Sequence, residues 1–235
     1  MKLLLYCIVQ QDLDEPLQEP GMGVVAAHGL AAVVSRVEET SSAPSVSSVL
    51  AFEKVVETIH ARQAVIPLRY GCVMESESAI VRLLEAHRQE YEAILGRLRG
   101  MTEMGIRVLC PARPEFLPRS PLSPGAAYLT SLRNRYGSGD SLAPEEAHLA
   151  DQITALLSGC YTEQRREISP ADQGQLISLY FLLPKIDVER FRNSVRQICP
   201  PDGTRLLLSG PWPPYNFASS PAKSCNEFGI ASLLQ

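Results

Sequence analysis

Five prolines, spaced three or four residues apart, fall between residues 111 and 124 and divide the chain into two parts. Each proline removes a backbone donor and fixes φ, so this stretch forms neither a helix nor an internal strand. We therefore expect a semi-rigid linker at residues 111–124. The chain has 235 residues, enough for two small domains. We place the first domain at residues 1–110, the second at 125–217 and a tail at 218–235.

The first part combines short apolar runs with stretches of helical periodicity. The dipeptide His28-Gly29 separates two apolar runs as the turn of a hairpin does. Pro67 confines its strand to a sheet edge, and Ser76 is a good N-cap for the longest helix. Leu50 and Ile59 lie on the apolar stripe of the helix before it. The expected elements are strands at residues 3–9, 24–27 and 30–34, a helix at 47–61, an edge strand at 64–70, a long helix at 76–99 and a strand at 105–110.

The second part repeats this mixture of helices and strands. Leu156 lies on the apolar stripe of one helix, and Asp187 stands at the N-cap position of another. The expected elements are helices at residues 124–136 and 144–161, a central strand at 175–183, a helix at 187–198 and a strand at 205–209. Strands that alternate with helices in both parts predict an α+β protein of two small α+β domains.

Charge and composition argue against several functions. Lysine and arginine total 22 against 26 acidic residues, a net charge of −4, whereas proteins that follow nucleic-acid phosphates are basic. The longest uncharged apolar run, residues 20–35, is shorter than the roughly 20 residues of a membrane-spanning helix. The six cysteines form no C-x-x-C pair, and the four histidines are scattered. We expect a soluble cytoplasmic protein with no nucleic-acid or lipid-membrane partner, no metal, no cofactor and no catalytic site.

Two segments carry unusual residues. One holds the only tryptophan among three prolines, and a stiff backbone of this kind either presents aromatic side chains to a partner or closes its own domain. The other holds Arg69, whose planar guanidinium either ties two elements together or contacts a partner, with the structural role favoured. Trp212 is expected at the seam between the domains. The structural or partner-interface candidates are Pro67, Leu68, Arg69, Gly71, Gly210, Pro211, Trp212, Pro213, Pro214 and Tyr215.

These segments resemble the gas vesicle protein F/L family. The matching motifs are VIPLRYG at residues 65–71, LSGPWPPYNF at 208–217 and HGLAAVVS at 28–35. Their order and spacing agree over about residues 3–217. Tyr70 stands where the family commonly has phenylalanine, and Phe52 stands where a histidine commonly precedes the glutamate, so no role of that histidine carries over.

The resemblance implies an accessory or minor structural protein of gas vesicle assembly, without enzymatic activity. It implies a modified ferredoxin-like fold for the C-terminal domain. The implied partners are the hydrophobic major shell protein of the GvpA type and other accessory vesicle proteins, and the implied location is the gas vesicle. We expect the N-terminal domain to bind the shell protein through a sheet edge, beside Pro67, or through an apolar groove of the helix at 76–99.

Two alternatives stay open from the residues alone. An enzyme for a small substrate would use Cys72, whose neighbour Arg69 favours the thiolate, and would show a deep polar pocket with a histidine near the thiol. A regulatory ligand-binding module would show a closed pocket in a cleft between the domains. An apolar surface groove would favour assembly over either alternative.

Overall fold

The computed structural model describes residues 2–11, 21–37, 45–111, 144–171 and 174–218. It divides into two compact units. The first comprises Met1–Glu103 together with Pro211–Gln235, and the second comprises Met104–Gly210. The C-terminal aromatic segment therefore belongs to the same unit as the N-terminus.

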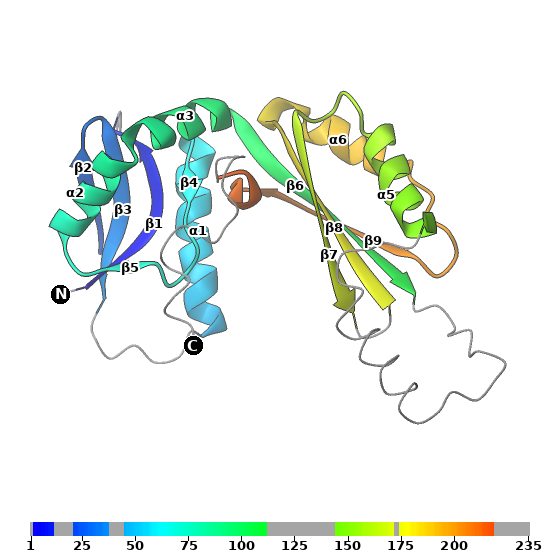
Figure 1. Cartoon of the computed structure of the whole chain (residues 1–235), viewed down its shortest axis with the longest axis horizontal. Helices are drawn as coiled ribbons and strands as arrows, with labels where there is room; N and C mark the ends of the chain where they lie inside the picture. Colours follow the sequence, from blue (N-terminus) through cyan, green and yellow to red (C-terminus); the bar gives the residue numbers. More distant parts are fainter. Residues whose placement is uncertain (1, 12–20, 38–44, 112–143, 172–173, 219–235) are drawn as a thin grey trace. The chain divides into compact units, whose positions relative to one another are not determined.

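The sheet of the first unit has the strand order β2-β3-β1-β4, and β5 also pairs with β1 (Figure 1). Every pair is antiparallel. The turn between β2 and β3 is His28-Gly29, where both residues have positive φ, 55° and 83°, as a two-residue hairpin turn requires. The strands are β1 Lys2–Gln10, β2 Met22–Ala27, β3 Leu30–Val37, β4 Ile66–Pro67 and β5 Val73–Met74.

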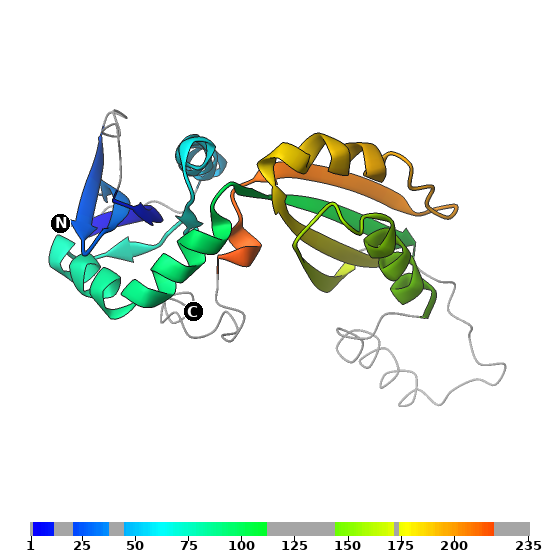
Figure 2. The ribbon, with the colours of Figure 1, turned by 90° about the horizontal axis from the view of Figure 1, so that it is seen from above.

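Helices cover both faces of this sheet. α1 (Val46–Arg62) lies on one face, and α2 (Glu77–Ala86) and α3 (Arg88–Leu98) lie on the other (Figure 2). The residues buried beneath α1 form one apolar cluster, called here the α1-side cluster. Its members are Leu4, Tyr6, Cys7, Val9, Ala31, Val33, Phe52, Val56, Ile59 and Val65.

Two expectations for the helices of this unit are wrong. The long helix expected at residues 76–99 is two helices, because the backbone leaves the helical conformation at His87 (φ −112°, ψ 16°). Leu50 is 59% exposed, because Phe52, Val56 and Ile59 form the side of α1 that packs on the sheet. The N-cap prediction for Ser76 is confirmed, since its side chain accepts a hydrogen bond from the Ala79 N–H.

The second unit contains a four-stranded sheet with the order β7-β8-β6-β9. Side chains of both helices and of strands β6 and β8 share one core cluster, so the helices lie on the same face. Strand β8 is internal, as the apolar run at 175–183 predicts. The elements are β6 Met101–Pro111, α5 Pro144–Leu156, β7 Glu163–Ala171, β8 Gly174–Pro184, η1 Lys185–Asp187, α6 Val188–Val195 and β9 Arg205–Trp212.

The described elements follow the order strand-helix-strand-strand-helix-strand, as in the ferredoxin-like motif. The α+β class is confirmed, with two antiparallel sheets and their helices. The finer ferredoxin-like assignment stays a prediction that this order supports.

The division into units differs from the expected boundaries. The strand expected at 105–110 is part of β6, which pairs with β8 and β9, so the first unit ends at Glu103 and not at residue 110. Residues from Pro211 onward belong to the first unit. The expected linker, apart from Pro111, and the helix at 124–136 lie outside the described residues.

Three further details of the second unit differ from expectation. Strand β7 was not expected at all. Leu156 is 63% exposed, because Leu149, Ala150, Ile153 and Leu157 form the buried stripe of α5. Asp187 stands at the start of α6 as expected, but its side chain makes no capping hydrogen bond.

Candidate partner-binding site

The motif around Arg69 leaves the edge of β1 and returns to it. Pro67 of β4 faces Cys7, and the Leu68 N–H donates to the Tyr6 carbonyl at 2.9 Å. The chain comes back where the Leu5 N–H donates to the Cys72 carbonyl at 2.8 Å. Strand β1 also has a bulge between Leu5 and Cys7 in its pairing with β3, on the side of β1 opposite to the excursion. Residues 68–72 therefore form a small loop anchored at both ends.

A tight turn shapes the loop. The Cys72 N–H donates to the Arg69 carbonyl at 3.3 Å, and Gly71 has φ 91°. A turn with positive φ at its third residue needs glycine there, because a side chain would be strained. The turn presents Arg69 and Tyr70 at the surface.

The side chain of Arg69 does not tie two of the described elements together. It is exposed, and it makes no hydrogen bond or ion pair with the residues that the structure describes. The described residues thus provide no partner for a structural role of this guanidinium, and that role stays a prediction. A surface guanidinium with its donors free is available to a carboxylate of another protein.

Aromatic rings connect the loop to the α1-side cluster. Tyr6 and Phe52 are stacked with ring centroids 4.7 Å apart. Phe52 also meets Tyr70 edge-on, at 5.4 Å. Tyr70 thus packs against the cluster through Phe52 and keeps 36% of its surface exposed to solvent.

The second motif, residues 208–217, packs its C-terminal end against the first unit. Tyr215 packs against the α1-side cluster, and burial raises the pKa of its hydroxyl, with Glu53 the next cause. Phe217 is fully buried. Pro213 and Pro214 are also buried, whereas Pro211 is exposed. These residues act as a plug for their own unit, which is the structural alternative for this segment.

Polar side chains of β6 and α3 hold the plug in place. The carboxylate of Glu103, which is buried, accepts hydrogen bonds from the Asn216 backbone N–H at 2.9 Å and from Asn216 Nδ2 at 2.6 Å. Arg97 donates to the Phe217 carbonyl, and Thr102 Oγ1 donates to the Trp212 carbonyl at 3.0 Å. Sequence reasoning missed these anchors, because they lie more than a hundred residues from their partners.

Trp212 is only partly buried. Its side chain is 41% exposed, and the fully buried aromatic residue of the motif is Phe217, so the expected place of Trp212 at a domain seam stays a prediction. Gly210 has φ 103°, and its carbonyl accepts a hydrogen bond from Arg192 at 3.1 Å within the second unit. The motif therefore contains a glycine with positive φ, a half-exposed tryptophan and a buried plug.

Cys72 is poorly suited to be a nucleophile. It is buried, and burial raises the pKa of its thiol above the ordinary value of 9.0. A raised pKa lowers the fraction of reactive thiolate at neutral pH.

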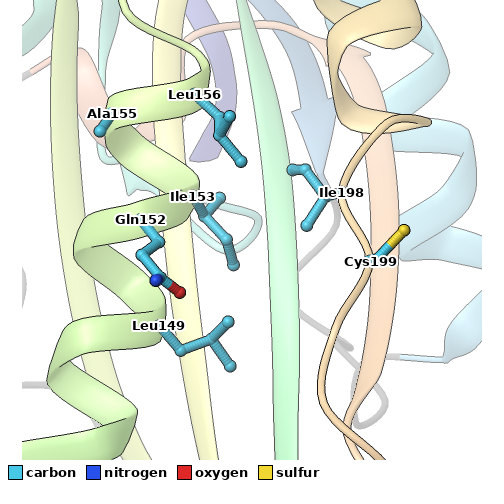
Figure 3. Close-up of a pocket in the computed structure, with 7 residues that line it drawn as sticks. All are labelled: Leu149, Gln152, Ile153, Ala155, Leu156, Ile198 and Cys199. Carbon is cyan, nitrogen blue, oxygen red and sulfur yellow. The ribbon is translucent and has the colours of Figure 1, made fainter.

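The second unit has a hollow of about 470 Å³ where Leu149, Ile153 and Leu156 of α5 face Ile198 (Figure 3). Its lining is mainly aliphatic, and the cysteine beside it is Cys199.

Two other kinds of site are absent from the described residues. Within the described ranges, no three His, Cys, Asp or Glu side chains come together as metal ligands. No helix in that part of the chain has both the length and the apolarity to span a bilayer.

Comparison with known proteins agrees with the motifs. Residues 2–219 match the sequence profile of the family described as "Gas vesicle synthesis protein GvpL/GvpF". The chain is 24% identical to gas vesicle protein F2 of Halobacterium salinarum over 197 residues, covering 82% of this chain and 78% of that protein. It is also 24% identical to gas vesicle protein L of a Streptomyces species over 189 residues, covering 75% and 71%.

Solved structures show the same fold. GvpF from Microcystis aeruginosa superposes with a TM-score of 0.69 at 17% identity, covering 93% of this chain and 99% of that one. GvpF from Anabaena sp. PCC7120 superposes with a TM-score of 0.64 at 18% identity, covering 93% and 96%. The profile match over nearly the whole sequence decides the family, and this chain belongs to the gas vesicle GvpL/GvpF family.

Proposed function

We propose that this protein supports gas vesicle assembly in the cytoplasm by binding the hydrophobic major shell protein, of the GvpA type, and other accessory vesicle proteins. The family membership supports a role in gas vesicles. The binding itself, the partners and the location are the proposal. A shell subunit with large apolar faces needs a folded partner before it polymerises, because exposed apolar patches aggregate.

The observation that carries the proposal is the apolar surface of the first unit. Six large apolar side chains of its described part are exposed, and they occupy both sheet edges, the start of α1 and the aromatic motif. They are Val24, Val46, Leu50, Tyr70, Val73 and Trp212. Exposed apolar groups of this kind suit a partner that is itself apolar.

The main apolar residues of α2 and α3 are not open to such a partner. The apolar residues of α2 and α3, among them Ile80, Leu84, Ile94 and Leu95, are buried against the sheet. A helix-groove mode of binding would require these helices to leave the core. The sheet edges, the start of α1, the Arg69 turn and Trp212 are the remaining surfaces.

We assign the Arg69 turn to an accessory vesicle protein with an exposed carboxylate. The free guanidinium offers a bidentate contact, and Tyr70 beside it offers a rigid aromatic contact. The apolar surfaces are left for the shell protein. The two partner classes thus use different chemistry on the same unit.

Co-purification tests the proposal. The full chain, carrying an affinity tag, is produced together with the shell protein, and the eluate is analysed by mass spectrometry. We expect the shell protein in the eluate and an increased fraction of it in the supernatant of the lysate. Shell protein that stays entirely in the pellet and out of the eluate would contradict the proposal.

A further inference from the structure

The two edges of the sheet in the first unit are built differently. One edge consists of β4 and β5, which have two residues each, and Pro67 lacks an N–H. Short strands and proline are common means by which proteins protect an edge from further pairing. The other edge is β2, which has six residues (MGVVAA) with no proline and no charged side chain. Among the strands that the structure describes, only this edge of the sheet lacks the usual protection.

The hairpin geometry shows which backbone groups β2 offers. The residues that flank a two-residue turn, Ala27 and Leu30, face each other and exchange hydrogen bonds. Alternation along an antiparallel ladder then directs the backbone groups of Val25 and Gly23 toward β3 as well. The N–H and C=O groups of Met22, Val24 and Ala26 point away from β3, toward the open edge.

The side chains of the same three residues share one face of the sheet. Val24 and Ala26 face Val33 and Ala31, which belong to the α1-side cluster. Val24 is 40% exposed and Ala26 is exposed, because α1 lies over β1 and not over β2. The opposite face is closed, since α2 contacts β2 and Val25 is buried. An added strand would therefore extend both the ladder and an apolar surface.

We propose that the outer edge of β2 accepts an extended, uncharged aliphatic segment of the shell protein as an added strand. This inference rests on the proposed function and names its site. Residues 20–35 contain no Asp, Glu, Lys or Arg, so a charged segment placed there would lose hydration without gaining a partner. An aliphatic segment has no charged group to dehydrate, and it covers Val24 and Ala26.

A second copy of this chain fits the edge less well than a shell segment. A stable dimer usually buries about 20–30 residues on each side, and two paired six-residue strands fall well short of that. A contact of this size is weak and reversible, which suits a factor that must release each subunit to the growing shell. Main-chain hydrogen bonds would supply the affinity, and the apolar face would select uncharged segments.

The Val24→Pro variant tests the site in the full chain. Proline removes an N–H that points to the open edge and leaves the bonds to β3 intact, as at natural edge positions. Val24→Lys adds a charge at the same point, and Leu207→Lys adds the same charge to an exposed leucine of the second unit as a matched control. Circular dichroism melting shows whether each variant is folded.

Two measurements are combined. The first is the amount of co-produced shell protein that each variant retains. We expect a fall of about tenfold for both Val24 variants, which corresponds to roughly 1.4 kcal/mol, and no change for Leu207→Lys. The second is amide hydrogen exchange of the wild-type chain, in which the amides of Met22, Val24 and Ala26, which point to the open edge, should become protected when the shell protein is bound.

The outcomes separate this inference from the proposed function. If the wild-type chain retains no shell protein, the proposed function fails and the inference fails with it. If the wild-type chain retains it, but the folded Val24 variants do so equally and the amides of Met22, Val24 and Ala26 stay unprotected, only the β2 site is wrong. Protection of these three amides in the purified chain alone, together with a dimeric mass, would assign the edge to a second copy and overturn the proposal.

Discussion

The bond between Glu103 and Asn216 should be one of the main anchors of the first unit. Replacing Asn216 by alanine removes the donor at 2.6 Å from Glu103 Oε1 and leaves a buried carboxylate with one fewer partner. Hydrogen bonds to charged groups contribute about 1.5–3 kcal/mol, so we expect Asn216→Ala to lower the free energy of unfolding by about 2 kcal/mol. Glu103→Gln removes the charge and replaces one of the two oxygens that accept from Asn216 by an NH2 group, which cannot accept.

A double-mutant cycle isolates the pair. Because both substitutions act on one bond, the loss in the double variant should be smaller than the sum of the two single losses by about 1–2 kcal/mol. Urea unfolding followed by tryptophan fluorescence is suitable, because Trp212 is the single tryptophan and belongs to this unit.

A surface pair of the same unit provides the control. Gln10 Oε1 accepts a hydrogen bond from Arg99 at 2.7 Å in an exposed position, so Gln10→Ala should change the free energy by no more than about 0.5 kcal/mol. Additive losses at Glu103 and Asn216, or a loss at Asn216 no larger than that of the control, would refute the reasoning.

Three further predictions concern the Arg69 turn and the thiols. Gly71→Ala should lower the free energy of unfolding in urea by about 1–2 kcal/mol, because Gly71 has a positive φ that strains a side chain. Gly96→Ala in α3, where a Cβ meets nothing within 4 Å, should instead raise this free energy by about 0.5–1 kcal/mol. Equal effects of the two substitutions would contradict backbone strain at residue 71. Arg69→Ala should leave the free energy of unfolding within about 0.5 kcal/mol of wild type but reduce co-purification of accessory vesicle proteins; a loss above about 1 kcal/mol would support the structural role. In a variant with Cys225 replaced by serine, an aromatic disulfide reagent at pH 8 should modify the exposed Cys199 before the buried Cys72. Burial raises the pKa of the Cys72 thiol, so the reaction at Cys72 should become faster as the pH rises. Equal rates at the two thiols, measured by mass spectrometry, would show that Cys72 is accessible.

Periodicity and turn chemistry predicted the elements whose signals are local. The apolar run at residues 3–9 became β1, and His28-Gly29 became the hairpin turn. Strand β7 escaped prediction because its sequence, EQRREISPA, is rich in charge and lacks an apolar alternation. It is an edge strand that pairs only with β8, and this pairing, not an apolar alternation in its own sequence, holds it in the sheet.

The spacing of apolar residues predicted which side of each helix is buried, but not which residues at the margin of that side are exposed. Leu50 and Leu156 fit the spacing of their helices, yet each lies beyond the width of the sheet or core that the helix covers. Only the neighbouring elements decide which edge of a stripe is buried. The break at His87 likewise carries no glycine or proline that would have signalled it.

The two candidate motifs were recognisable, but their roles were not. Proline, glycine and aromatic residues marked both segments as unusual. The roles depend on pairings such as Glu103 with Asn216, across 113 residues, which no local pattern contains. The exposed position of Arg69 and the burial of Phe217 rather than Trp212 follow from such long-range contacts.

Vesicle formation in cells that carry a complete set of gas vesicle genes tests the central claim most directly. Removing only this chain should abolish vesicles in electron micrographs and leave the shell protein in the insoluble fraction, and the wild-type chain should restore both. Normal vesicles and unchanged shell-protein solubility in cells without this chain would contradict a role in holding the shell protein for assembly.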